Sequence, residues 1–125
     1  MNKIQAVSFA LLALSSTAYA TGTTSGGAAT SSTVAVSTTV CDGLKEAVSI
    51  QLSANNYGEV NCPSATAAGV GVANLKGAGR SYGASSNGGA LSENPAAGTT
   101  PTPFTNAAAA SSAAQSRAAT AAGST

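Results

Sequence analysis

Residues 33–62, TVAVSTTVCDGLKEAVSIQLSANNYGEVNC, hold the richest apolar stretch of the chain after its N-terminal segment. Val34 and Val36 alternate with small or polar residues, which is typical of a half-buried strand. The stretch also contains both cysteines of the chain, Cys41 and Cys62. An apolar core this small rarely supplies enough stability alone, so the sequence predicts one small module that a covalent cross-link holds together.

Residues 44–54 admit two interpretations. As a helix capped by Asp42, the segment places its apolar residues on one face. As a strand, it alternates Val48, Ile50 and Leu52 with polar residues. The first four residues of the segment favour a helix by composition, so we lean slightly towards a helix that begins near Asp42.

The N-terminal segment has the pattern of a secretory signal peptide. Lys3 supplies a positive charge, residues 4–14 form an apolar run, and Ala18-Tyr19-Ala20 is a small-x-small cleavage site. The run is well short of the roughly twenty residues that cross a membrane. We therefore expect cleavage between Ala20 and Thr21, and a secreted product, residues 21–125, that is extracellular or held in the cell wall.

Export into an oxidising compartment makes a disulfide the expected state of Cys41 and Cys62. A loop of this length contributes about 3 kcal/mol to stability on the chain-entropy model. Metal binding is the competing interpretation, but two thiols in a chain without histidine fall short of the four ligands of a structural zinc site. We expect no metal and no cofactor.

The exported chain is expected to carry no net charge. Loss of Lys3 leaves four basic and four acidic residues. Nucleic acids and anionic membranes attract clustered Lys and Arg, so we expect no nucleic-acid partner and no membrane contact after signal cleavage. Large apolar residues are also scarce, which predicts a mostly disordered chain.

The composition therefore divides the chain into five parts. The predicted fold class is a mostly disordered, low-complexity chain with one small α+β or β-rich disulfide-closed module. A C-terminal Ala-rich helix would be partial at most, because no large apolar face is present to dock it. The expected parts are a signal peptide (1–20), a flexible leader (21–32), the module (33–76), a Gly/Ser/Thr/Pro-rich linker (77–105) and an Ala-rich tail (106–125).

Four threonines, Thr99, Thr100, Thr102 and Thr105, lie next to two prolines in the expected linker. Proline keeps such a segment extended and exposes its hydroxyl groups, which is the composition of O-glycosylated stalks. These four residues are the predicted O-glycosylation sites.

Two patterns could indicate catalysis. Residues 79–83, Gly-Arg-Ser-Tyr-Gly, match the nucleophile elbow of hydrolases, but a serine nucleophile needs a base and the chain has no histidine. Asp42 and Glu46 lie four residues apart, but a solvated pair on a surface is poorly suited to general acid catalysis. We expect a glycine-rich loop at residues 79–83 and no enzymatic activity.

Two functions fit these expectations. The first is a secreted structural or surface protein that associates with a cell-wall or matrix polymer, or with itself. The composition is similar to that of fungal cell-wall mannoproteins, and a bacterial matrix or fibre protein fits the same observations. The second is a small secreted effector or recognition module that binds a host or cell-surface protein through the disulfide loop.

Overall fold

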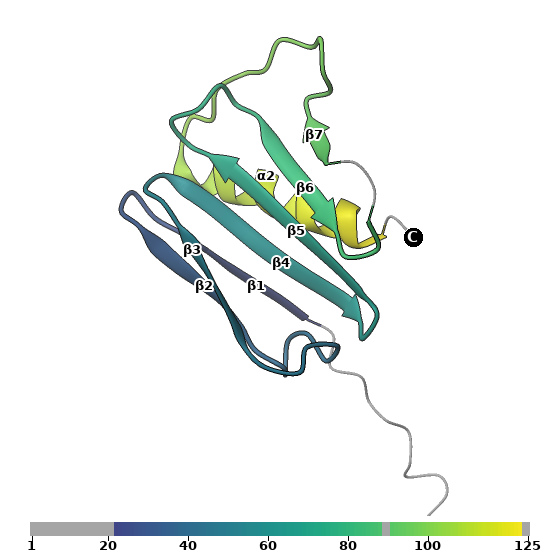
Figure 1. Ribbon diagram of the computed structural model, residues 1–125. Helices are drawn as coiled ribbons and strands as arrows, with labels where there is room; N and C mark the ends of the chain where they lie inside the picture. Colours follow the sequence, from purple (N-terminus) through teal and green to yellow (C-terminus); the bar gives the residue numbers. More distant parts are fainter. Residues whose placement is uncertain (1–21, 89–90, 124–125) are drawn as a thin grey trace, which may run out of the picture.

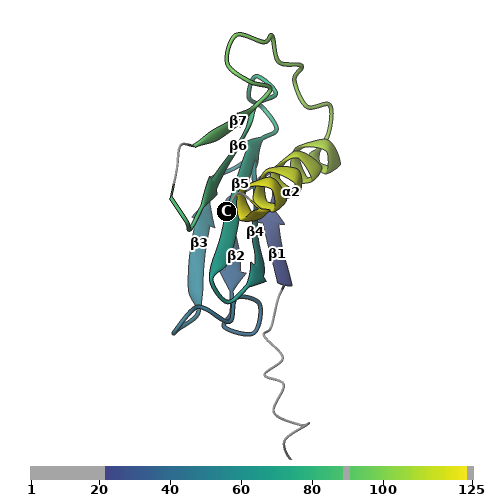
Figure 2. The same ribbon diagram turned by 90° about the vertical axis from the view of Figure 1, so that its right-hand side faces the viewer.

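The computed structural model describes residues 22–88 and 91–123, which form three layers (Figures 1 and 2). An antiparallel sheet of order β1-β4-β5-β6-β7 lies in the middle, the antiparallel pair β2-β3 packs on one face, and a helix packs on the other. The elements are β1 (Gly22–Gly27), β2 (Ser32–Val36), β3 (Val48–Leu52), β4 (Asn56–Ser64), β5 (Ala67–Asn74), β6 (Ser81–Ser85), β7 (Ser92–Asn94) and α2 (Ala107–Gly123). The expected signal peptide, with its cleavage site at Ala20 and Thr21, lies outside the described residues.

Strand β4, which lies between β1 and β5, contributes side chains to two separate cores, because successive residues of a strand point to opposite faces. Val60 and Cys62 pack with β2 and β3 in the first core. Tyr57 packs with Ala73 and with the helix in the second core. The five-stranded sheet is therefore covered on both sides.

The helix approaches the sheet almost backbone to backbone. A Cβ atom added at Gly71 would lie 2.0 Å from the carbonyl oxygen of Ala114, and one added at Gly69 would lie 2.2 Å from that of Ala118. Only glycine leaves room for a helix at this distance, and the close approach lets many weak dispersion contacts form. The helix presents methyl groups to this surface through its buried residues Ala110, Ala114, Ala118, Ala121 and Ala122.

The start of the helix is fixed by a side chain. The Oδ1 atom of Asn106 accepts a hydrogen bond from the backbone N–H of Ala109 at 2.9 Å, which is a helix N-cap. Phe104 and Leu75 pack against the same core as the first turn of the helix. The chain therefore enters α2 in a defined direction.

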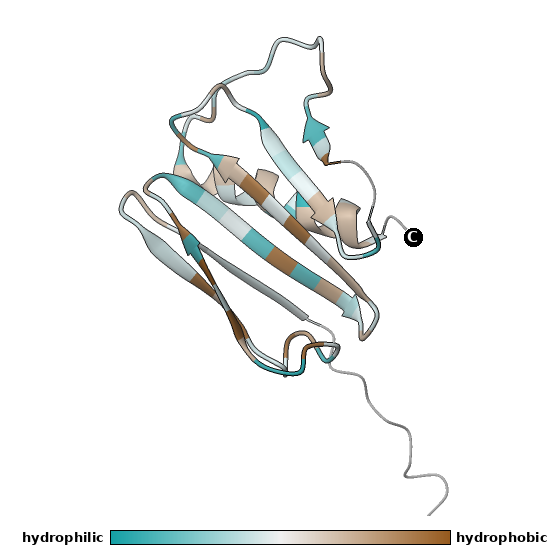
Figure 3. Cartoon of the chain, viewed as in Figure 1, coloured by the Kyte–Doolittle hydropathy of each residue, from teal (hydrophilic) through white to brown (hydrophobic). Residues whose placement is uncertain are grey.

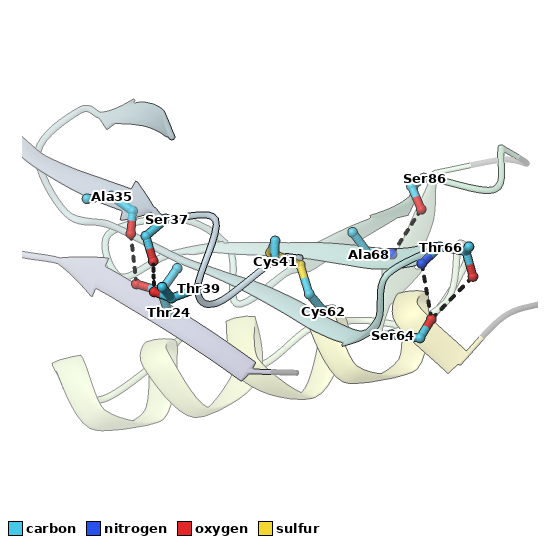
Figure 4. The surroundings of a disulfide bond; sticks show 10 residues. All are labelled: Thr24, Ala35, Ser37, Thr39, Cys41, Cys62, Ser64, Thr66, Ala68 and Ser86. Atoms are coloured by element: carbon cyan, nitrogen blue, oxygen red, sulfur yellow. Dashed lines mark hydrogen bonds between the residues drawn. A yellow bond between two sulfur atoms is a disulfide. The ribbon is translucent and has the colours of Figure 1, made fainter. Parts of the chain in front are cut away.

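The predicted disulfide between Cys41 and Cys62 is confirmed (Figure 4). It joins the segment between β2 and β3 to strand β4, with 5.3 Å between the two Cα atoms. Both cysteines are buried in the first core. The bond thus ties the two-stranded sheet to the five-stranded one.

The β-rich module and the C-terminal helix are also confirmed, but the ordered part extends beyond the expected module. β1 lies in the segment expected to be a flexible leader (21–32), and β6 and β7 lie in the expected linker (77–105). The Ala-rich tail is a docked helix rather than a partly formed one. The physical reason is that Gly and Ala bury backbone and methyl surface, which a count of large apolar side chains does not include.

Two local predictions are wrong. The slight preference for a helix in residues 44–54 fails, because Val48–Leu52 is strand β3, whose residues Ile50 and Leu52 pack against the first core. The expected glycine-rich loop at residues 79–83 runs into strand β6, which begins at Ser81. In both places tertiary packing outweighs local composition.

We expect the substitution Gly71→Ala to lower the free energy of unfolding by about 1–3 kcal/mol, the usual cost of overpacking. The added methyl group would force α2 away from β5. Urea unfolding of residues 21–125, followed by circular dichroism, measures the loss. The matched control is Gly123→Ala, because nothing lies within 4 Å of a Cβ atom added there. Equal stability of the two variants would contradict the close packing of the helix.

The double substitution of Cys41 and Cys62 with serine should lower the free energy of unfolding by about 3 kcal/mol, because the unfolded chain loses its cross-link. Urea titrations with and without reductant measure this effect. The reductant should destabilise the wild-type protein and leave the double variant unchanged. A wild-type protein that is indifferent to reductant would refute the contribution of the disulfide.

Candidate binding site

The two-stranded sheet covers only part of its face of the larger sheet (Figure 1). β2 and β3 contact β1 and β4. On the same face of the larger sheet, most of β5 and β6 is not covered by the two-stranded sheet. On that uncovered part, the side chain of Val72 is 36% exposed, and its cross-strand neighbour Tyr82 is half-buried. The two sheets therefore form an incomplete sandwich.

An apolar hollow lies where the coverage ends. Its cavity volume is ≈ 180 Å³. Figure 3 shows hydrophobic segments on β2, β3, β4 and β5, the strands that supply most of its walls. No lining residue carries a charged, hydroxyl or amide side chain. The lining residues are Val36, Cys41, Leu44, Val48, Ile50, Val60, Cys62, Ala68 and Val70.

Strand β3 borders the hollow as an edge strand. In the described part of the chain it pairs with β2 alone. Alternate residues of such a strand direct their N–H and C=O groups away from the paired neighbour. The strand contains no proline and no charged residue, and the side chain of Val48 is 43% exposed.

β7, an edge strand of the five-stranded sheet, has features that hinder the addition of another strand. β7 is only three residues long and carries Glu93, whose carboxylate forms a salt bridge with Arg80. Pro95 follows it directly. Short length, charge and proline all discourage the addition of another strand. β3 has none of these features apart from its modest length.

Of the predicted site residues that the structure describes, Cys41 and Cys62 are brought together in the disulfide, and the threonines lie on a different segment. The four threonines, Thr99, Thr100, Thr102 and Thr105, are exposed on the segment that joins β7 to α2, and their glycosylation stays a prediction. Both cysteines of the disulfide line the hollow. The sequence pattern does not locate the hollow itself, although the alternation of apolar residues in β3 is the signal that places Val48 and Ile50 in its wall.

Ser81 lies on β6, whereas Asp42 and Glu46 lie in the segment between β2 and β3. Ser81 is 1% exposed, and its Oγ atom donates a hydrogen bond to the backbone oxygen of Asn94. Asp42 and Glu46 are exposed. Within residues 22–88 and 91–123, no three His, Cys, Asp or Glu side chains gather as metal ligands. No helix in that same part has the length and hydropathy needed to span a membrane.

One carboxyl group is buried between the sheet and the helix. Glu59 on β4 is 7% exposed, and its side chain forms a hydrogen bond with Gln115 of α2. Burial raises the pKa of Glu59 above its ordinary value, and the hydrogen bond partly opposes this rise. This buried group could not be expected from the sequence alone, because a lone Glu is normally solvated.

The fold and the hollow define a small, disulfide-bonded, β-rich module with one incompletely covered apolar face. Comparisons of the chain with protein-family models, with curated proteins and with solved structures found no match.

The raised pKa of Glu59 predicts a specific pH dependence of stability. Between the ordinary pKa of 4.5 and the raised value, the folded protein binds more protons than the unfolded chain, so its stability falls as pH rises. The substitution Glu59→Gln keeps the shape and removes the titration. Urea unfolding from pH 4 to pH 8 should show this fall in the wild-type protein and not in the variant. Parallel pH profiles would contradict the burial of the carboxyl group.

Proposed function

We propose that residues 21–125 form a secreted, non-enzymatic structural or surface protein that works by association with cell-wall or matrix material. The observation that carries the proposal is the apolar hollow beside the free edge of β3. Exposed apolar surface of this kind marks interaction sites, and an unprotected edge strand is a template for further pairing. A protein that acted alone would gain nothing from leaving both uncovered.

Two further features support a role outside the cell. The pattern of residues 1–20 favours export, and the disulfide persists in an oxidising compartment. The four exposed threonines between β7 and α2 are accessible to O-glycosylation. Sugars on this segment would solvate a protein that carries no net charge after cleavage.

A second candidate function is favoured by the position of the disulfide loop. Leu44 and Cys41 belong to the segment between β2 and β3, and both line the hollow. A small recognition module or effector could therefore bind one host or cell-surface protein with this loop and the hollow together. The two functions differ in whether the protein works as part of an assembly or as a free monomer.

Fractionation of the culture that produces the chain tests the proposal. We expect most of the protein in the pelleted wall or matrix fraction. Its intact mass should correspond to a chain that begins at Thr21, lacks two hydrogens because of the disulfide, and carries a ladder of hexoses. A monomer that stays in the medium and binds one soluble protein would overturn the proposal in favour of the recognition module.

A further inference from the structure

We propose that β3 and the hollow bind an extended, uncharged polypeptide segment of a partner protein, which adds to the β2-β3 sheet as a third strand. This inference rests on the proposed function, since it names the partner of the same surface. It joins two observations that are independent of each other: the unpaired backbone edge of β3 and the apolar floor beside it.

The backbone edge specifies a polypeptide. Among the described residues, β3 forms its ladder with β2 only, so alternate N–H and C=O groups on its outer edge lack a strand partner. These groups repeat at the spacing of an extended chain, and main-chain hydrogen bonds supply the affinity when a peptide adds to a sheet edge. Neither a sugar nor an acyl chain reproduces this pattern of donors and acceptors.

The apolar surface of β5 beside β3 indicates which side chains the bound segment carries. An added strand lies about 4.8 Å from β3 and therefore above β5, where Val70 and Val72 are incompletely covered. Every second side chain of that strand would point down into the hollow, as Val48 and Ile50 do from β3. Apolar residues at alternate positions would bury this surface.

The absence of charged residues from the lining of the hollow indicates that the bound segment is uncharged. No Lys, Arg, Asp or Glu lines the hollow. Glu93, on the far strand β7, is already paired with Arg80. A charged side chain that pointed into the hollow would therefore lose its hydration without meeting an opposite charge among the lining residues. Anionic lipids and polyanions are disfavoured because no cluster of basic residues borders the hollow.

A second copy of the chain fits this edge poorly. An antiparallel two-fold pairing of β3 with β3 would bring both five-stranded sheets to the same side, where each would occupy the space of the other. A parallel two-fold pairing would turn the strand over and present Ser49 and Gln51 to the hollow, in place of Val48 and Ile50. A single extended segment from another protein avoids both problems.

The test uses residues 21–125 with the disulfide formed and a short capped peptide of alternating Thr and Val, about as long as β3. The control peptide has the same composition with all the Val residues at one end. Binding is measured by isothermal titration calorimetry, and amide hydrogen exchange is measured by NMR. We expect the alternating peptide to bind, and amides of Val48–Leu52 that exchange rapidly in the free protein to become protected.

Two protein variants separate this mode from loose apolar contact. Val48→Lys places a charge at the edge of the hollow and should weaken peptide binding at least about tenfold, because charged residues guard natural edge strands. Thr33→Lys is the matched control, since Thr33 lies on β2 with its side chain exposed on the other face of the two-stranded sheet, and this variant should bind like the wild type. Circular dichroism checks that both variants fold.

The outcomes distinguish the inference from the proposed function. Equal binding of the two peptides, or binding without protection of the β3 amides, would overturn the inference. So would protection of these amides by self-association alone. Association with the wall or matrix in the absence of peptide binding would leave the proposed function standing, whereas peptide binding by a protein that stays free in the medium would leave only the inference.

Discussion

The close contact between α2 and the glycines of β5 is the interaction on which the rest of the structure depends. Gly69 and Gly71 present bare backbone, and Ala114 and Ala118 lie directly over them. This contact orders the C-terminal tail, and glycine backbone and alanine methyl groups cover much of one face of the sheet, beside Tyr57, Leu75 and Phe104. Dispersion contacts between these closely packed atoms stabilise the interface between the helix and the sheet, where large apolar side chains do so in most cores.

Most of the valine, leucine and isoleucine side chains lie in the core on the other face of the sheet. Val60 and Val70 point away from the helix because β4 and β5 alternate, and they meet Val34, Val36 and Leu52 of the two-stranded sheet. The disulfide fixes that sheet over β4. Each element of the candidate site is thus positioned by the register of β4, whose one face meets the helix and whose other face meets the disulfide.

The sequence predicted what depends on local pattern and on covalent chemistry. The strand around Val34 and Val36, the disulfide and the C-terminal helix follow from alternation, cysteine count and alanine content. The docking of the helix could not be predicted in the same way, because the value of Gly71 lies in the atom it lacks, and its partner Ala114 is more than forty residues away. The hollow escaped prediction for a related reason: it is a space between strands that are distant in sequence.

The opening beside β3 is a consequence of strand number rather than of side-chain size. Two strands spaced about 4.8 Å apart cannot cover a sheet of five, however large their residues are. Larger side chains at Ala68 or Val70 would fill the floor, but the backbone edge of β3 would still lack a ladder partner. Only a further strand satisfies the edge and covers the floor together. The topology itself therefore makes an extended polypeptide the natural complement of this face.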